Sequence, residues 1–144
     1  MARIPRVELV GFPHHVTQRG NRRLRTFYSG TDYRAYFRLM ADAKTKAAVS
    51  IWAYCLMPNH YHLLLQTPRA NLSVAAGWLQ TTCSVRFNRR HRRSGHLFQG
   101  RLKAHLVEED AYARELIKYI HLNSVRPKDK RKPIPPELKR ELRK

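Results

Sequence analysis

The chain has 144 residues, 42% of them hydrophobic, which predicts one folded domain around one core. Its 29 lysines and arginines against 10 acidic residues give a net charge of +19, which favours a polyanionic partner, most often nucleic acid. No apolar run approaches the roughly 20 residues of a membrane-spanning helix, and two isolated cysteines are too few for a disulfide framework. We therefore expect a cytoplasmic protein that binds nucleic acid and has no membrane partner.

Hydrophobic periodicity predicts strands and helices in alternation. Apolar–polar alternation indicates a first strand within residues 6–19, and a helical stripe follows over 33–48. Two further strands, 49–57 and 60–67, are separated by Pro58-Asn59, which suits a tight reversal into a hairpin. The remaining predicted elements are a helix over 72–93, a strand over 95–108 and a helix over 109–125 that ends before Arg126-Pro127.

The order β-α-β-β-α-β-α favours an α+β fold, with an antiparallel sheet of split-βαβ (ferredoxin-like) type that carries helices on one face. The last helix has no place in that plan, so we expect it on the other face or at an edge. We expect a single domain over residues 1–126 and a basic C-terminal tail over 127–144.

Two histidines begin the third predicted strand, in the segment MPNHYHLLL. Because side chains two apart on a strand share a face, His60 and His62 are expected side by side, with Tyr61 on the opposite face. Two imidazoles at this spacing can hold one divalent ion if other ligands complete the shell, although His-x-His also occurs by chance. Two ligands are too few for a closed structural zinc site, so a metal here would keep open positions, as catalytic metals do.

The last predicted helix carries a second polar pair, Tyr119 and Asn123, four residues apart and therefore on one side of the helix. Asn123 offers an oxygen suited to a hard divalent cation. Tyr119 offers a phenol that becomes a workable nucleophile toward a polarised phosphodiester, although a tyrosine on such a helix more often packs into the core. His121 points away from Tyr119, so we expect it to be a packing or surface residue.

Three blocks in this order resemble the REP-associated tyrosine transposases, of transposase 17 type, which belong to the HUH superfamily of single-strand transposases. The blocks are PRVELVGFPHHVTQRGNRR, MPNHYHLLL and GHLFQGRLKAHLVEEDAYARELIKYIHLNSVRP. The similarity runs from about Pro5 to Arg126, which is most of the chain. Each block alone is weak evidence, and the three together are specific.

The resemblance implies a role for each member of the two polar pairs. His60 and His62 match the HUH ligands of a divalent ion, Mg²⁺ or Mn²⁺, and Asn123 matches the third ligand. Tyr119, on a late helix near the HUH strand, matches the nucleophile that attacks single-stranded DNA to give a 5′-phosphotyrosine and a free 3′-hydroxyl. The implied substrate is a hairpin-forming, REP-like palindrome. The implied protein is a monomer or homodimer that associates with the bacterial nucleoid.

Two groups of basic residues are candidate DNA-binding surfaces. One lies on the predicted 72–93 helix, in a stretch without acidic residues between Thr67 and Lys103. The other precedes Phe27 and Tyr28, which are either core anchors or platforms for base stacking. A run of charges alone is usually a solvated surface, so both alternatives remain open. The candidate residues are Arg86, Arg89, Arg90 and Arg93 in the first group, and Arg3, Arg6, Arg19, Arg22 and Arg23 in the second.

The other histidines, and two other functions, give alternative interpretations. His14, His15, His96 and His105 are further candidate ligands if the metal is zinc, but His14 and His15 point to opposite faces, so only one can join His60 and His62. The protein is alternatively a non-catalytic binder of hairpin DNA or structured RNA. A second alternative is a metal-dependent nuclease that uses water, with Tyr119 only orienting the phosphate.

Overall fold

The structure is a computed structural model that describes residues 10–108 and 110–123. Within these residues the chain forms an antiparallel sheet in the order β2-β3-β1-β4 and three α-helices, which confirms the predicted α+β fold. The strands are β1 (His14–Arg19), β2 (Ser50–Met57), β3 (His60–Gln66) and β4 (Lys103–Leu106). The helices are α1 (Gly30–Ala47), α2 (Leu72–His91) and α3 (Asp110–Asn123), with a short 3₁₀ turn η1 (Asn21–Arg23).

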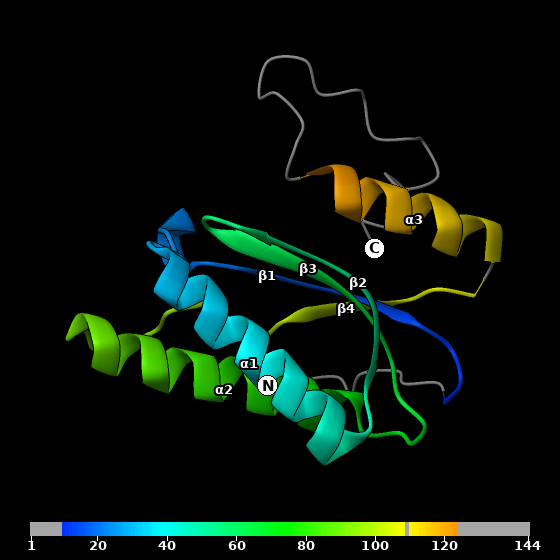
Figure 1. The fold of residues 1–144 in the computed structure, drawn as a ribbon, viewed down its shortest axis with the longest axis horizontal. Coiled ribbons are helices and arrows are strands. Elements are labelled where there is room, and N and C mark those ends of the chain that lie inside the picture. The colour runs from blue at the N-terminus through cyan, green and yellow to red at the C-terminus, as the bar shows by residue number, and fades with distance from the viewer. Residues whose placement is uncertain (1–9, 109, 124–144) are drawn as a thin grey trace, which may run out of the picture.

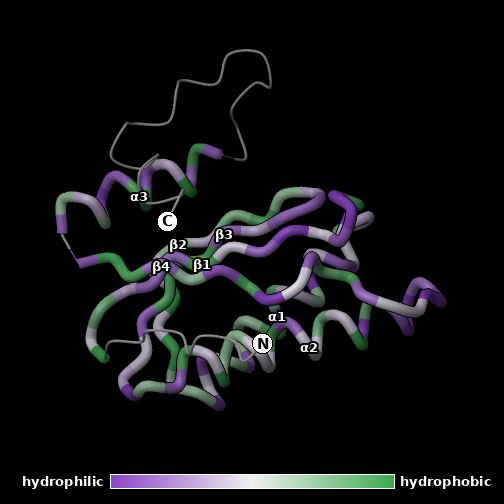
Figure 2. Tube along the Cα trace, turned by 180° about the vertical axis from the view of Figure 1, so that it is seen from behind, coloured by the Kyte–Doolittle hydropathy of each residue, from purple (hydrophilic) through white to green (hydrophobic). Residues whose placement is uncertain are grey.

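The helices form layers on the two faces of the sheet. Both views of the chain place α1 and α2 on one side of the sheet and α3 on the other (Figure 1, Figure 2). The larger hydrophobic cluster lies between the sheet and α1 and α2, and includes Tyr36, Leu39 and Leu79. A smaller one lies under α3, where Leu116 and Ile120 pack against Leu64. The last helix is thus on the opposite face, one of the two places expected for it.

Strand β3 is covered on both faces, and its alternation decides which side chains meet α3. Tyr61, Leu63 and Leu65 belong to the larger cluster under α1 and α2. Leu64 belongs to the smaller cluster, so His60 and His62, which share its parity, face the α3 side. Tyr61 is turned away from the histidines, as the strand periodicity predicts.

The predicted first and last strands are longer than the strands observed. Strand β4 covers only Lys103–Leu106 of the predicted 95–108, because Gly95 and Gly100 have φ of +91° and +64°, outside the extended region. The preceding loop contributes only an isolated bridge between Phe98 and Gly20. Strand β1 begins at His14, after Gly11 with φ +84°. Residues 6–9, the end of the predicted last helix and the 127–144 tail lie outside the described residues.

Hydrophobic helices long enough to cross a bilayer are absent from the part of the chain that the structure describes.

Candidate active site

The two strand histidines lie on the α3 face of the sheet, at the end of β3 next to the β2–β3 turn. His62 lies between Thr17 of β1 and Cys55 of β2, and His60 pairs with Arg19 and Met57 on the same two strands. The His60 and His62 ring centroids are 5.3 Å apart, with the ring planes nearly perpendicular. His62 is buried and His60 is half-buried, so the pair opens toward solvent on the His60 side.

The turn before β3 holds His60 through Asn59. The Asn59 Oδ1 and His60 Nδ1 atoms are 2.7 Å apart, and Asn59 Nδ2 donates to the carbonyl of Arg23 at 3.3 Å. The backbone of the turn is bonded to the loop after β1, because Gly20 N donates to Asn59 O at 2.8 Å. An added Cβ at Gly20 would lie 2.1 Å from Leu24 O, so this close approach requires glycine.

A third histidine, His15 of β1, lies directly against His62. Its Nε2 is 3.1 Å from His62 Nδ1, and the two rings stack with centroids 5.3 Å apart. Burial, together with nearby His105, lowers the pKa of His15 to about 4. Burial, followed by the charges of His15, His60 and Arg19, lowers the pKa of His62 to about 3. Both imidazoles are therefore neutral at physiological pH, which is the form that binds metals.

Helix α3 brings Tyr119 to this site. The Tyr119 and His62 ring centroids are 6.0 Å apart, and the phenol ring stands edge-on to the imidazole. Ala113, Leu116 and Ile120 are buried on the side of α3 that packs on the sheet, and Tyr119 is half-buried at the margin of that cluster. The histidine pair and the late tyrosine, 57 residues apart in sequence, are thus neighbours within one chain.

Asn123 is the last residue of α3, one turn beyond Tyr119, and is half-buried. His121 is exposed, as expected for a residue that points away from Tyr119. In the part of the chain that is described, no group of three or more His, Cys, Asp or Glu side chains is placed to hold a metal ion. The predicted donors remain two imidazoles and an amide oxygen, those of His60, His62 and Asn123. Donors of this kind suit an open divalent site, and the 2.7 Å contact with Asn59 Oδ1 occupies the Nδ1 side of His60.

The predicted DNA-binding arginines fall into three groups. Arg19 is exposed at the end of β1 on the same face as His60. Arg22 and Arg23 are exposed in η1, where both have positive φ. Arg86, Arg89 and Arg90 are exposed on the C-terminal part of α2, on the other side of the sheet from α3, and Arg93 is exposed two residues after the helix ends. Arg3 and Arg6 lie outside the described residues.

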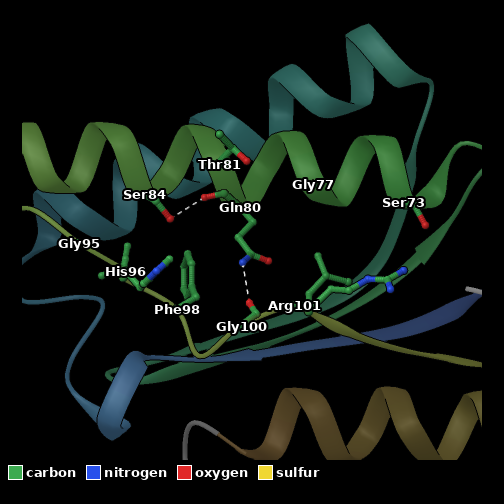
Figure 3. A pocket seen from close by; sticks show the side chains of 12 residues that line it. Ser73, Gly77, Gln80, Thr81, Ser84, Gly95, His96, Phe98, Gly100 and Arg101 are labelled. Carbon is green, nitrogen blue, oxygen red and sulfur yellow. Dashed lines mark hydrogen bonds between the residues drawn. The ribbon is translucent and has the colours of Figure 1, made fainter. Parts of the chain in front are cut away.

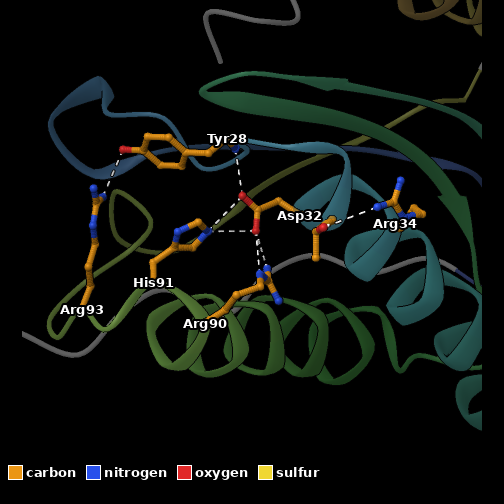
Figure 4. Close-up of polar contacts among 7 residues, drawn as sticks. Tyr28, Asp32, Arg34, Arg90, His91 and Arg93 are labelled. Carbon is orange, nitrogen blue, oxygen red and sulfur yellow. Dashed lines mark hydrogen bonds and ion pairs between the residues drawn. The ribbon is translucent and has the colours of Figure 1, made fainter.

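Arg90 differs from its neighbours because it is bonded to a buried carboxylate. Asp32 of α1 is 2% exposed, and its Oδ1 lies 2.7 Å from Arg90 Nε and 2.9 Å from His91 Nε2 (Figure 4). Burial alone would raise the pKa of Asp32, but hydrogen bonds from Tyr28 N, His91 and Arg90 outweigh it and lower the pKa. Arg90 therefore joins α2 to α1, a role that the charge run did not indicate.

The two aromatic residues beside the N-terminal arginines have separate positions. Phe27 is buried in the larger cluster and stacks on Tyr33. Tyr28 is 39% exposed, with the guanidinium groups of Arg25 and Arg93 at 5.6 and 5.1 Å from its ring centroid. Phe27 is thus a core anchor, whereas Tyr28 is an accessible ring flanked by cations.

Of the other candidate histidine ligands, His15 meets the pair directly. His105 of β4 lies opposite His15 in the register of the two strands. His14 is buried and, as the neighbour of His15 on β1, faces the α1 and α2 side. His96 lines a separate cavity of about 440 Å³ between α2 and the loop before β4, with Gln80, Ser84 and Arg101 (Figure 3). The sequence did not predict the hydrogen bonds that Asn59 and His15 make with His60 and His62. Strand alternation did allow one of His14 and His15 to lie beside these two histidines.

Comparison with known proteins agrees with this arrangement of sheet and helices. The chain is similar to a solved structure described as a REP-associated tyrosine transposase bound to a REP hairpin, with a TM-score of 0.69, 20% identity, and coverage of 87% of this chain and 73% of that one. It is also similar to a putative transposase from Deinococcus radiodurans R1, with a TM-score of 0.57, 16% identity, and coverage of 83% and 96%. No curated protein gives a significant match.

The fold is thus one that transposases of known structure adopt. The family model described as IS200-like transposase matches residues 11–123, most of the chain. The chain belongs to the IS200-like transposase family.

Proposed function

We propose that this transposase cuts and rejoins single-stranded DNA at hairpin-forming, REP-like palindromes, with Tyr119 as the nucleophile. The observation that carries the proposal is the edge-on approach of Tyr119 to His62, at 6.0 Å between ring centroids, within a single chain. The hairpin substrate is inferred from the similar transposase whose structure holds a REP hairpin. Because one chain holds both groups, a monomer suffices for the chemistry.

We infer that His60, His62 and Asn123 bind one divalent cation, Mg²⁺ or Mn²⁺. Two neutral imidazoles and an amide oxygen are donors that such ions accept, and they leave coordination positions open. When bound, the cation supplies positive charge to a phosphate oxygen of the scissile bond. The protein's contribution is to hold both rings by hydrogen bonds from their Nδ1 sides, through Asn59 and His15.

Tyr119 carries out the covalent step. Its Oη forms a bond to phosphorus as the bond from phosphorus to the 3′ oxygen breaks, which leaves a 5′-phosphotyrosine. The phenol gives up one proton and the 3′ oxygen gains one, so the exchange is balanced. Attack by a 3′-hydroxyl reverses the step and rejoins strands without ATP, provided that water is kept from the phosphotyrosine. Packing of Leu116 and Ile120 against the sheet fixes the phenol in place for in-line attack.

The charged residues nearest the site suggest how DNA reaches it. Arg19, which pairs with His60, and Lys103, which pairs with Thr17, are exposed on the α3 face of the sheet. Arg22 and Arg23 continue this surface along η1, next to the Asn59 turn. We infer that these side chains bind phosphates on either side of the scissile bond. Arg86 and Arg89 of α2, and Arg93 beside Tyr28, would hold a more distant part of the DNA.

The test uses a hairpin oligonucleotide labelled at its 3′ end, because the 5′-phosphotyrosine retains the 3′ portion of the strand. With Mn²⁺, the wild-type protein should give a labelled band of protein size on a denaturing gel, and excess EDTA should abolish it. Tyr119→Phe should still bind the hairpin but give no adduct. Tyr112→Phe, a half-buried tyrosine on the same helix, is the matched control and should retain the adduct.

The outcomes separate the proposal from its alternatives. A non-catalytic binder of hairpin DNA or RNA would give no adduct and no cleavage with any variant. A nuclease that uses water would release free 5′-phosphate ends, and Tyr119→Phe would still cleave. An undiminished adduct with Tyr119→Phe would eliminate Tyr119 as the nucleophile.

A further inference from the structure

We propose that Asn59 and His15 are positioning residues that hold His60 and His62 in the same tautomer, with the proton on Nδ1. In that tautomer Nε2 is the unprotonated, metal-binding nitrogen of each ring. The inference rests on the proposed function, because it concerns the two residues assigned to the divalent cation. The His-x-His spacing places His60 and His62 side by side but does not set their tautomers, which the inference assigns to hydrogen bonds with Asn59 and His15.

The tautomer of His60 follows from the chemistry of its partner. Asn59 Oδ1 is a carbonyl oxygen and only accepts, so the 2.7 Å contact requires a proton on His60 Nδ1. The orientation of the Asn59 amide is fixed from its other end, because Nδ2 donates to the carbonyl of Arg23 at 3.3 Å. A flipped amide would place oxygen against oxygen at Arg23 and nitrogen against His60.

The position of Asn59 is fixed by the loop that follows β1. Thr26 N and Phe27 N both donate to Pro58 O, at 2.8 and 3.1 Å, and Gly20 N donates to Asn59 O. The loop is anchored in turn by Phe27, which is 1% exposed in the core. The turn that carries Asn59 is therefore held by the fold before any metal or DNA binds.

The tautomer of His62 depends on which way its bond with His15 runs. His15 Nε2 and His62 Nδ1 are 3.1 Å apart, a hydrogen-bond distance, so one proton lies between these two buried nitrogens. If His15 donated it, His62 would carry its own proton on Nε2 and have no nitrogen left for a metal. Metal binding by His62 therefore requires His15 to accept, which places the proton of His15 on Nδ1. His105 lies opposite His15 on the paired strand β4.

Paired substitutions test the hydrogen bonds separately from shape. Asn59→Leu and His15→Leu remove the acceptor at similar size, whereas Asn59→Asp and His15→Gln retain an acceptor oxygen. His14→Leu, on the opposite face of β1, controls for the loss of a buried strand histidine. Binding of Mn²⁺ to the full chain without DNA is measured by calorimetry, and circular dichroism verifies that each variant is folded. The ring tautomers of the metal-free protein are read from long-range ¹⁵N–¹H spectra.

We expect the two leucine variants to bind Mn²⁺ about 10–100-fold more weakly, as for other residues that orient metal ligands. His15→Gln and His14→Leu should stay within about threefold of wild type, and both ligand rings should show the proton on Nδ1. Asn59→Asp keeps the acceptor for His60 but loses the donor to Arg23 O, so it should bind Mn²⁺ more tightly than Asn59→Leu. Leucine variants that bind Mn²⁺ like wild type, or a His62 with its proton on Nε2, would overturn the inference but leave the proposed function standing. Equal Mn²⁺ binding by wild type and His62→Ala would instead remove the metal site itself.

Discussion

Helix α3 is attached to the sheet by few side chains, so a single truncation there should release Tyr119, the proposed nucleophile. Its fully buried anchors are Leu116 and Ile120, both 0% exposed, with Ala113 beside them at 5%. Leu116→Ala should cost about 3 kcal/mol, from lost burial and the cavity left behind. If α3 undocks on its own, this loss lowers its docked-to-undocked ratio by about 100-fold, since 1.4 kcal/mol corresponds to a factor of ten.

Two measurements should respond together in Leu116→Ala. Amide hydrogen exchange along α3 should accelerate by up to the same factor, while α2 amides change much less. Formation of the Tyr119 adduct should fall, whereas hairpin DNA binding should stay near wild type, because the basic residues of η1 and α2 are not on α3. Leu39→Ala is the control, because Leu39 is equally buried but lies in the larger cluster.

Leu39→Ala should lower the free energy of global unfolding without selectively accelerating amide hydrogen exchange in α3. The reasoning would be refuted if Leu116→Ala left α3 as protected as α2, or if exchange accelerated equally over the whole chain. Either result would show that α3 and the rest of the domain unfold as one cooperative unit.

Three other predictions concern the assembly of the site, the Asp32 cluster and the DNA surface. Because Tyr119 and His62 meet within one chain, a mixture of Tyr119→Phe and His62→Ala proteins should give no adduct; an adduct in the mixture would show that the tyrosine acts on a partner's site. Asp32→Asn should lower the free energy of unfolding by about 3 kcal/mol at neutral pH, because Arg90 and His91 lose a buried anion. The pKa of Asp32 in the folded protein is lowered from 3.8, so the ionised carboxylate stabilises the fold above pH 3.8 and loses this effect as the pH falls through the folded pKa. The difference in unfolding free energy between wild type and Asp32→Asn should therefore shrink in acid. A difference that does not change with pH would contradict this prediction. Replacing Arg86 and Arg89 by Gln should weaken hairpin binding and reduce the slope of log K against log salt by about 2 if both contact phosphates, and an unchanged slope would place the DNA elsewhere.

Most of the fold could be predicted because its elements have strong local periodicity. The hairpin of β2 and β3 follows from two β-rich runs around Pro58-Asn59, and α1, α2 and α3 follow from their apolar stripes. The ends of β4 could not be predicted, since Gly95 and Gly100 adopt positive φ only in the context of the loop that packs on Gln18 and Gln80. Strand alternation also gave the common face of His60 and His62, which needs no knowledge of the partner strands.

What the sequence did not show depends on register between distant segments. His15 reaches His62 only because β1 pairs with β3 so that Thr17 lies opposite His62. A shift of one residue would place His14 on the α3 face instead. Arg90 likewise belonged to a charge run with no nearby acid, and its partner Asp32 comes from a helix 58 residues away. Local composition therefore did not indicate that Arg90 is bound within the protein.

The proposed ligands carry no charge, and such a donor set would favour binding of a phosphate. Many divalent sites use carboxylates, whose negative charges compensate the ion and repel a nucleic acid. Here the inferred ligands are two imidazoles and an amide, and the nearest charged neighbour of His60 across the strands is Arg19. A divalent ion at such a site keeps its full positive charge, and Arg19 and Lys103 add to it on the same face. In the proposed mechanism, a phosphate of the DNA backbone would supply the counter-charge beside the phenol of Tyr119.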